Sequence, residues 1–143
     1  PQATAETIRD GWLHTGDIGA IDERGYLYLK DRMKDVIISG GFNVYPSDVE
    51  GALTRHPSVY ECVVFGVGDE KWGERVEAAV VLREGANAGA AELSAFVKDG
   101  LGSVKTPKAI HIVDDLPRSA VGKVLRRDVK AQWNTADRRT LAG

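Results

Sequence analysis

Residues 36–50 read VIISGGFNVYPSDVE, and this stretch contains the signals for a strand, a turn and the start of a helix. Val36 to Ser39 is a short apolar run of mainly β-branched residues, which favours a strand. Two glycines follow, and they permit the positive φ angles of a tight turn. Ser47 follows Pro46 and precedes Glu50 by three residues, a capping-box pattern that predicts a helix ending near the next proline.

The chain after this stretch alternates between strand and helix patterns. Apolar runs rich in valine predict strands, and apolar residues at helical spacing predict a helix over residues 90–101. The expected strands are residues 59–67, 76–82 and 109–113, and the expected last helix is residues 123–133. We therefore predict an α+β fold, in which a small three-stranded sheet packs against helices.

A short β-hairpin is expected before residue 31. Residues 18–21 and 26–29 are rich in β-forming side chains, and they flank the turn sequence DERG at residues 22–25. Residues 31–35 then connect this hairpin to the α+β unit. The sequence thus predicts two parts joined by a short polar linker.

Composition limits the classes of function. The chain has 143 residues, of which 43% are hydrophobic, and a net charge of −2, which together suit one domain with a core. This charge argues against nucleic-acid binding, and the small basic cluster of Arg126, Arg127 and Lys130 is interpreted as a solvated helix face. No apolar run approaches the roughly 20 residues of a membrane span, so no transmembrane segment is expected.

The cysteine and the histidines give no sign of a nucleophile or a metal site. Cys62 is the single cysteine and lies in an apolar run without a flanking base, so we expect a buried strand residue. A chain that can form no internal disulfide suits a reducing compartment, and we expect a cytoplasmic protein. His14, His56 and His111 lack metal-ligand spacing, and no metal ligands are expected in this chain.

Three motifs follow one another along the chain. Residues 11–17 read GWLHTGD, residues 30–35 read KDRMKD, and residues 116–127 read LPRSAVGKVLRR. Together they resemble the C-terminal part of adenylate-forming enzymes, the superfamily of acyl-CoA ligases, amino-acid adenylation domains and luciferases. The sequence ISGGFNVYP at residues 38–46 resembles the acyl-CoA ligases more than the adenylation domains of peptide synthetases.

The resemblance implies a division of the chain into three parts. Residues 1–33 would be the end of a large N-terminal adenylation domain, residues 34–133 a mobile C-terminal domain, and residues 134–143 a flexible tail. The chain begins with Pro1 rather than Met, and we expect it to be part of a longer protein. The missing N-terminal domain is then its first partner.

Lys123 is the predicted catalytic residue. It lies on a glycine-containing loop before the last helix, where a long side chain can bring a point charge to a phosphate or carboxylate. On local sequence alone, a solvated turn is the more common explanation. The resemblance gives this lysine a charge-stabilising role when a carboxylate attacks the α-phosphorus of MgATP.

Nucleotide contacts and a hinge are expected around the linker. By resemblance, Asp17 accepts hydrogen bonds from the ribose of ATP or AMP, and Arg32 contacts the ribose or a phosphate. Lys34 is the expected hinge, about which the C-terminal domain rotates between half-reactions. The alternatives are a turn residue at the hairpin entry for Asp17 and a salt-bridged surface loop for Arg32 and Lys34.

Coenzyme A is expected to contact the glycine loop. By resemblance, Ser39, Gly40 and Gly41 lie beside the pantetheine arm of CoA, where glycine lets another molecule approach the backbone closely. A β-turn that merely needs glycine explains the same residues on local grounds.

The CoA nucleotide has three further candidate contacts. Trp72, Lys105 and Lys108 could bind its adenine or phosphates, and a packing role is equally open for Trp72. Val104 stands where the family usually has an aromatic residue before the lysine. Stacking on adenine is therefore not expected from that position.

The sequence predicts the C-terminal lid domain of an ATP-dependent acyl-CoA ligase. The expected reaction converts a carboxylic acid, ATP and CoA into acyl-CoA, AMP and pyrophosphate through an acyl-adenylate, with Mg²⁺ held mainly by the missing domain. The alternatives are a fatty-acyl-AMP ligase or carrier-protein-loading adenylation domain, and a non-catalytic interaction module derived from this domain. The chain alone is expected to be inactive, because the ATP phosphate loop and the acid pocket lie in the missing domain.

Overall fold

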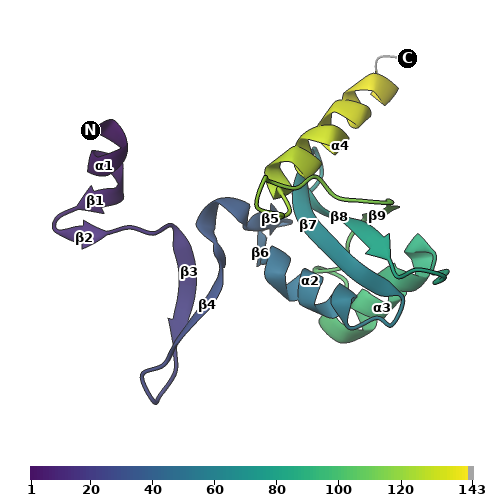
Figure 1. Ribbon diagram of the computed structural model, residues 1–143, viewed down its shortest axis with the longest axis horizontal. Helices are drawn as coiled ribbons and strands as arrows, with labels where there is room; N and C mark the ends of the chain where they lie inside the picture. The colour runs from purple at the N-terminus through teal and green to yellow at the C-terminus, as the bar shows by residue number, and fades with distance from the viewer. Residues whose placement is uncertain (142–143) are drawn as a thin grey trace.

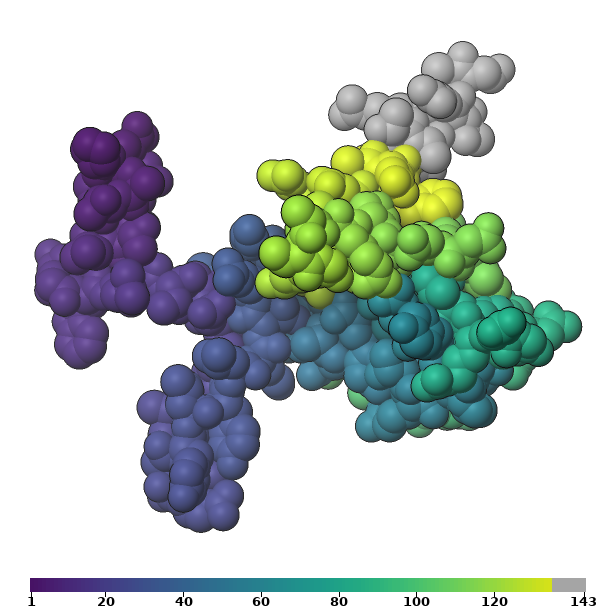
Figure 2. Space-filling model, viewed as in Figure 1, coloured from purple at the N-terminus to yellow at the C-terminus, as the bar shows by residue number. Residues whose placement is uncertain are grey.

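A five-stranded sheet with helices on both faces forms the body of the molecule, and two small hairpins project from it (Figure 1). The computed structural model describes the backbone of residues 1–141 and the side chains of residues 1–134. The projecting part comprises α1 (Gln2–Thr7), β1 (Ile8–Arg9), β2 (Trp12–Leu13), β3 (Asp17–Ile21) and β4 (Leu27–Arg32). The antiparallel pairing of β3 with β4 confirms the predicted hairpin. Figure 2 shows these hairpins standing apart from the body.

The body follows the 3₁₀ turn η1 (Met33–Asp35). Its elements are β5 (Ile37–Ser39), β6 (Phe42–Val44), α2 (Pro46–Thr54), β7 (Val59–Asp69), β8 (Gly73–Leu82), α3 (Ala90–Leu101), β9 (Ala109–Ile112) and α4 (Arg126–Leu141). The strand order is β6-β5-β8-β7, with β9 parallel to β8 and the other pairs antiparallel. The predicted α+β class and the bounds of α3 are confirmed.

The sheet has five strands rather than the predicted three. The short strand β5 is extended by a hairpin to β6, and β9 returns beside β8. Gly40 and Gly41, with φ angles of +58° and +81°, make the turn of the β5–β6 hairpin. Consecutive positive φ angles are what a type I′ two-residue hairpin turn requires, and glycine adopts them without strain. The glycine pair therefore adds β6, which was not predicted, while β5 is the strand predicted at residues 36–39, here part of the same sheet.

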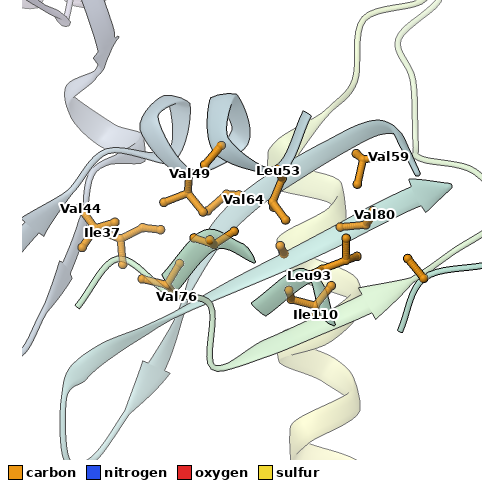
Figure 3. Packing of buried hydrophobic residues seen from close by; sticks show 14 residues of the cluster. Ile37, Val44, Val49, Leu53, Val59, Val64, Val76, Val80, Leu93 and Ile110 are labelled. Atoms are coloured by element: carbon orange, nitrogen blue, oxygen red, sulfur yellow. The ribbon is translucent and has the colours of Figure 1, made fainter. Parts of the chain in front are cut away.

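The sheet separates two hydrophobic cores. Alternate residues of β8 point to opposite faces, so Val76, Ala78 and Val80 pack under α2 and α3. Figure 3 shows this first core, to which α2 contributes Leu53. The second core contains Ala79 and is covered by α4. Because α4 carries the end of the lysine motif, this packing fixes the motif to the sheet.

The start of α2 differs from the predicted capping box. The helix begins at Pro46 with Tyr45 as its N-cap, and no side chain of its own caps it. The Ser47 hydroxyl instead donates to the carbonyl of Lys30 at 2.8 Å. Glu50 accepts a hydrogen bond from the backbone N–H of Val64 at 2.9 Å rather than turning back to the helix. The capping-box prediction is wrong because tertiary partners take both side chains.

The last helix begins and ends later than predicted. It starts at Arg126 rather than Lys123, because Val124 still pairs with Arg118 in an antiparallel bridge. The backbone of α4 continues beyond Trp133 to Leu141, so part of the predicted flexible tail, residues 134–143, is helical. Residues 142–143 lie outside the described residues.

Candidate functional site

The lysine loop, residues 118–124, is closed at its base by the pairing of Arg118 with Val124. Inside it, the backbone N–H of Ser119 donates to the carbonyl of Lys123 at 2.8 Å. The N–H of Lys123 donates in return to the Ser119 hydroxyl oxygen at 3.2 Å. These bonds fix the lysine backbone, while its side chain remains exposed.

Arg118 anchors the lysine loop to the sheet. Its guanidinium forms an ion pair with Glu61 of β7 and donates to the carbonyl of Gly122 at 3.3 Å. The Asp115 carboxylate lies 3.8 Å from its Nε. Arg118 belongs to the motif, but no role was predicted for it from the sequence. The structure shows that it holds the loop that carries Lys123.

Three of the predicted residues line one pocket between the linker and the lysine loop. Arg32, Lys34 and Lys123 border this pocket of about 440 Å³. Its other lining residues are Asp35, Val124, Leu125, Arg126 and Arg127. Five of its lining side chains are cationic and one is acidic, so the pocket favours anions such as phosphate or carboxylate. We call it the cationic pocket.

Asp17 lies beside the cationic pocket and pairs with Arg32, whose Nε is 3.4 Å from its carboxylate. The backbone N–H of Asp17 donates to the hydroxyl of Thr15 at 3.2 Å. The threonine therefore makes the turn at the hairpin entry, and the aspartate carboxylate does not. This leaves the carboxylate next to a second pocket of about 530 Å³, which Thr15 and Gly16 also line.

The glycine loop, residues 39–41, lies beside Trp72, and together they form a second group of predicted CoA contacts. The N–H of Gly40 donates to the carbonyl of Trp72 at 2.8 Å. The indole lies so close that a Cβ on Gly40 would be 2.9 Å from its Cε3 atom. Lys108 places its Nζ 5.5 Å from the ring centroid, and Lys71 places its own at 4.9 Å. Ser39 is buried and pairs with Gly73 of β8, whereas Gly41 is exposed.

The turn before Trp72 is held by Asp69. Its Oδ1 accepts hydrogen bonds of 2.9 Å from the backbone N–H groups of both Lys71 and Trp72. The bond from Trp72, helped by that from Lys71, lowers the pKa of Asp69 below its ordinary value. Trp72 remains 39% exposed, so part of the residue is accessible to a ligand.

Lys105 does not join this second group. Its Nζ pairs with the Asp48 carboxylate of α2 at 3.0 Å. Val104 beside it is exposed and offers no aromatic ring. Of the three predicted contacts to the CoA nucleotide, the structure brings together Trp72 and Lys108 only.

The linker changes partners at Lys34. Before it, the N–H of Met33 donates to the carbonyl of Gly16 at 2.8 Å, which ties the chain to the hairpin. After it, Asp35 accepts a hydrogen bond of 3.1 Å from Arg126 of the body. Lys34 lies between these attachments, and among the described side chains no carboxylate pairs with it.

Arg126 is a residue whose interpretation from sequence was wrong. It is not on a solvated face, since its side chain is 25% exposed and bridges Asp35 and Glu50 at 3.1 and 2.7 Å. Burial acts to lower the pKa of Arg126, but Glu50 and Asp35 outweigh it and raise the pKa. Pairing with acids far away in sequence and lower exposure distinguish this arginine from Arg127, whose side chain is 93% exposed. Lys130 is also paired, with Glu74 at 3.6 Å.

Cys62, His56 and His111 make contacts inside the fold. Cys62 lies in β7 as predicted, but it is half-buried rather than buried. Burial raises the pKa of its thiol to about 12, so the thiol stays protonated near neutral pH. His56 pairs with Glu92, and His111 with the buried Glu77. Within the described part of the chain, no group of three or more metal-binding side chains occurs, and no helix could span a membrane.

Known proteins with the same sequence pattern are numerous. The AMP-binding enzyme C-terminal domain family matches residues 48–123. The chain is 52% identical over 127 residues to a long-chain-fatty-acid–CoA ligase of Bacillus subtilis, covering 89% of this chain and 23% of that one. It is 52% identical over 130 residues to a 2-succinylbenzoate–CoA ligase of Geobacillus kaustophilus, covering 91% and 26%. A fatty acid–[acyl-carrier-protein] ligase of Streptomyces coeruleorubidus, ScoC, is 44% identical over 140 residues, covering 97% and 27%.

Solved structures give the same result. ATP-bound MatB from Rhodopseudomonas palustris superposes with a TM-score of 0.88 at 40% identity, over 94% of this chain and 27% of that one. Apo MatB superposes with a TM-score of 0.73 at 40% identity, over 95% and 27%. The chain spans about a quarter of the length of the relatives that it matches. It belongs to the AMP-binding enzyme C-terminal domain family and corresponds to the C-terminal part of acid–CoA ligases.

Proposed function

We propose that this chain is the C-terminal domain of an ATP-dependent acid–CoA ligase. The full enzyme converts a carboxylic acid, ATP and CoA into acyl-CoA, AMP and pyrophosphate. The observation that carries the proposal is the cationic pocket, in which Lys123 of the lysine loop meets Arg32 and Lys34 of the linker. Cations on a fixed loop beside a linker suit charge stabilisation at a phosphate.

Lys123 acts in the first half-reaction. A carboxylate oxygen of the acid attacks the α-phosphorus of ATP, the bond to pyrophosphate breaks, and an acyl-adenylate forms. Both reactants are anions, so the ammonium of Lys123 offsets their repulsion and stabilises the charge that develops at the α-phosphate. Asp17 accepts hydrogen bonds from the ribose hydroxyls, and Arg32 beside it binds the nucleotide.

The second half-reaction uses the group around Trp72. The CoA sulfur attacks the acyl carbon, and AMP leaves. Gly40, Trp72 and Lys108 lie together, and none of them lines the cationic pocket. Two separate groups on one domain support alternation, in which rotation about Lys34 withdraws Lys123 and presents the glycine loop.

The missing N-terminal domain is the proposed partner of the hairpins. Trp12 and Leu13 of β2 and Leu29 of β4 are each at least 64% exposed. Large apolar side chains at such exposure suit an interface rather than water. Magnesium would be held by the ATP phosphates and by that domain, because the described part of this chain offers no cluster of metal ligands.

A carrier protein is the second candidate for the thiol acceptor. The ScoC relative is named for transfer to an acyl-carrier protein, and it matches nearly the whole chain. Val104 offers no ring to adenine and Lys105 is paired with Asp48, so part of the expected CoA nucleotide site is lacking. A carrier presents the same pantetheine arm without that nucleotide. Comparing CoA with a phosphopantetheinyl carrier protein as acceptor separates the two candidates.

The test uses the full-length enzyme and measures the half-reactions separately. Lys123→Ala should depress pyrophosphate exchange by about 100- to 1,000-fold, the loss typical of one missing transition-state donor. Thioester formation from supplied acyl-adenylate should change little. Trp72→Ala should instead slow thioester formation and change pyrophosphate exchange little. Lys98→Ala, at an exposed lysine of α3, should leave both steps unchanged.

Two results would contradict the proposed function. Equal loss of both steps in Lys123→Ala would mean that this lysine has a structural role. Absence of pyrophosphate exchange with every acid tried in the wild-type enzyme would favour a non-catalytic interaction module. The 143-residue chain alone should form no acyl-adenylate.

A further inference from the structure

We propose that Lys30 and Asp31 form a latch with the start of α2, which holds the hairpins against the body in this arrangement and releases when the domain rotates. The latch consists of the contacts between residues 30–31 and residues 45–47. The inference rests on the proposed function only in its assumption that the domain rotates.

Three contacts make up the latch. The Asp31 Oδ2 atom accepts a hydrogen bond from the backbone N–H of Ser47 at 2.9 Å. The Ser47 hydroxyl donates to the carbonyl of Lys30 at 2.8 Å. The Lys30 Nζ atom lies 4.9 Å from the centroid of the Tyr45 ring, within range of a cation–π interaction. Backbone and side-chain groups of two consecutive residues therefore engage one helix end.

Asp31 acts as the cap that α2 lacks. No side chain within the helix satisfies its first N–H groups, and the N-cap residue Tyr45 has no suitable acceptor. A carboxylate at this end also meets the positive pole of the helix. Its other oxygen accepts the N–H of Arg32 at 2.9 Å, so one carboxylate connects the linker directly to α2.

The latch crosses the proposed pivot, whereas the neighbouring contacts do not. Arg32 pairs with Asp17 of the hairpin, so this contact moves with the hairpin. Asp35 pairs with Arg126 of the body, so this contact moves with the body. Rotation at Lys34 keeps both pairs and breaks only the contacts of residues 30–31 with α2. Ser47 is half-buried, so water can replace its partners on release.

The two MatB structures overlap this chain to different extents. The TM-score is 0.88 for the ATP-bound structure and 0.73 for the apo structure, at the same identity and nearly the same coverage. The two MatB structures therefore differ over the region matched, and the latched chain resembles the ATP-bound one more closely. If rotation breaks the cap that Asp31 supplies, the cap favours the latched arrangement.

The experiment measures ¹⁵N relaxation and amide exchange of the 143-residue chain. In the wild type, residues 17–32 should tumble with the body. Asp31→Ala should remove this common tumbling and speed exchange of the Ser47 amide about tenfold, as loss of a charged acceptor predicts. The Val64 amide, which Glu50 holds inside the body, should keep its exchange rate.

Further variants keep the result interpretable. Ser47→Ala removes only the bond to the Lys30 carbonyl and should loosen the hairpins less than Asp31→Ala. Asp99→Ala, at an exposed acid of α3, should change nothing. Independent tumbling in the wild type, or common tumbling that survives Asp31→Ala, would overturn the latch. Because no catalysis is measured, neither outcome bears on the proposed ligase function.

Discussion

Replacing Arg126 by glutamine is expected to destabilise the chain by about 2 kcal/mol. The arginine makes hydrogen bonds of 3.1 Å to Asp35 and 2.7 Å to Glu50, and the substitution removes its charge. Hydrogen bonds to charged groups contribute about 1.5–3 kcal/mol each. The side chains of Arg126, Asp35 and Glu50 are about a quarter exposed, and glutamine can keep one hydrogen bond. We therefore expect a loss smaller than the sum of the two hydrogen-bond energies.

Urea unfolding followed by circular dichroism measures this loss. Arg127→Gln is the matched control, because its side chain is 93% exposed, and it should change the free energy of unfolding by less than about 0.5 kcal/mol. A double-mutant cycle with Glu50→Gln should give a coupling energy of about 1 kcal/mol. Equal losses in the two arginine variants, or a coupling energy near zero, would refute the bridging role of Arg126.

Three further predictions concern the pivot, the glycine loop and the cysteine. Lys34→Pro in the full enzyme should slow single-turnover thioester formation and let acyl-adenylate accumulate, because proline fixes φ at the pivot; an unchanged thioester rate would place the pivot elsewhere. Gly41→Ala should destabilise the chain by about 1–2 kcal/mol, because alanine is strained at a left-handed φ. Gly40→Ala should destabilise it more, because only there would the new Cβ also meet Trp72. Equal unfolding midpoints of the two variants would contradict this contact. Cys62 should resist alkylation at pH 8 until urea unfolds the chain. Because its pKa is raised in the folded chain, only the unfolded thiol ionises between about pH 9 and 12, and the free energy of unfolding should fall as pH rises through this range.

Local patterns predicted the elements whose signals lie within the elements themselves. Helix α3 has its apolar residues at helical spacing between turns, and its bounds agree with the prediction. The β3–β4 hairpin likewise follows from its turn sequence, where the Asp22 carboxylate accepts the N–H groups of Arg24 and Tyr26. Such contacts join residues a few positions apart, so a sequence window contains both partners.

Elements whose ends depend on distant residues were predicted less well. Ser47 and Glu50 fit a capping box, yet Asp31 takes the capping position and Glu50 turns to β7. Asp31 and Ser47 are 16 residues apart, and Glu50 and Val64 are 14 residues apart. A local pattern cannot exclude a stronger partner from elsewhere in the chain, and here charged partners prevail over the local bond.

The candidate site shows the same division. The motifs identified Arg32, Lys34 and Lys123, and the structure places all three around one pocket. They did not identify Arg118 or Arg126, which support that pocket through acids on other elements. Arginines that position a functional loop resemble solvated arginines until their partners are known.

The partners of the charged linker residues determine whether each residue is attached to the hairpin, to the body or to both. Arg32 belongs to the hairpin through Asp17, and Asp35 belongs to the body through Arg126. Asp31 joins the two parts, while Lys34 has no ion-pair partner among the described side chains. A hinge needs firm attachments on both sides of a short unattached segment, and this sequence of partners supplies them. The proposed rotation would therefore be confined to the immediate neighbourhood of Lys34, and in the proposed latch the contacts of Asp31 favour the arrangement seen here.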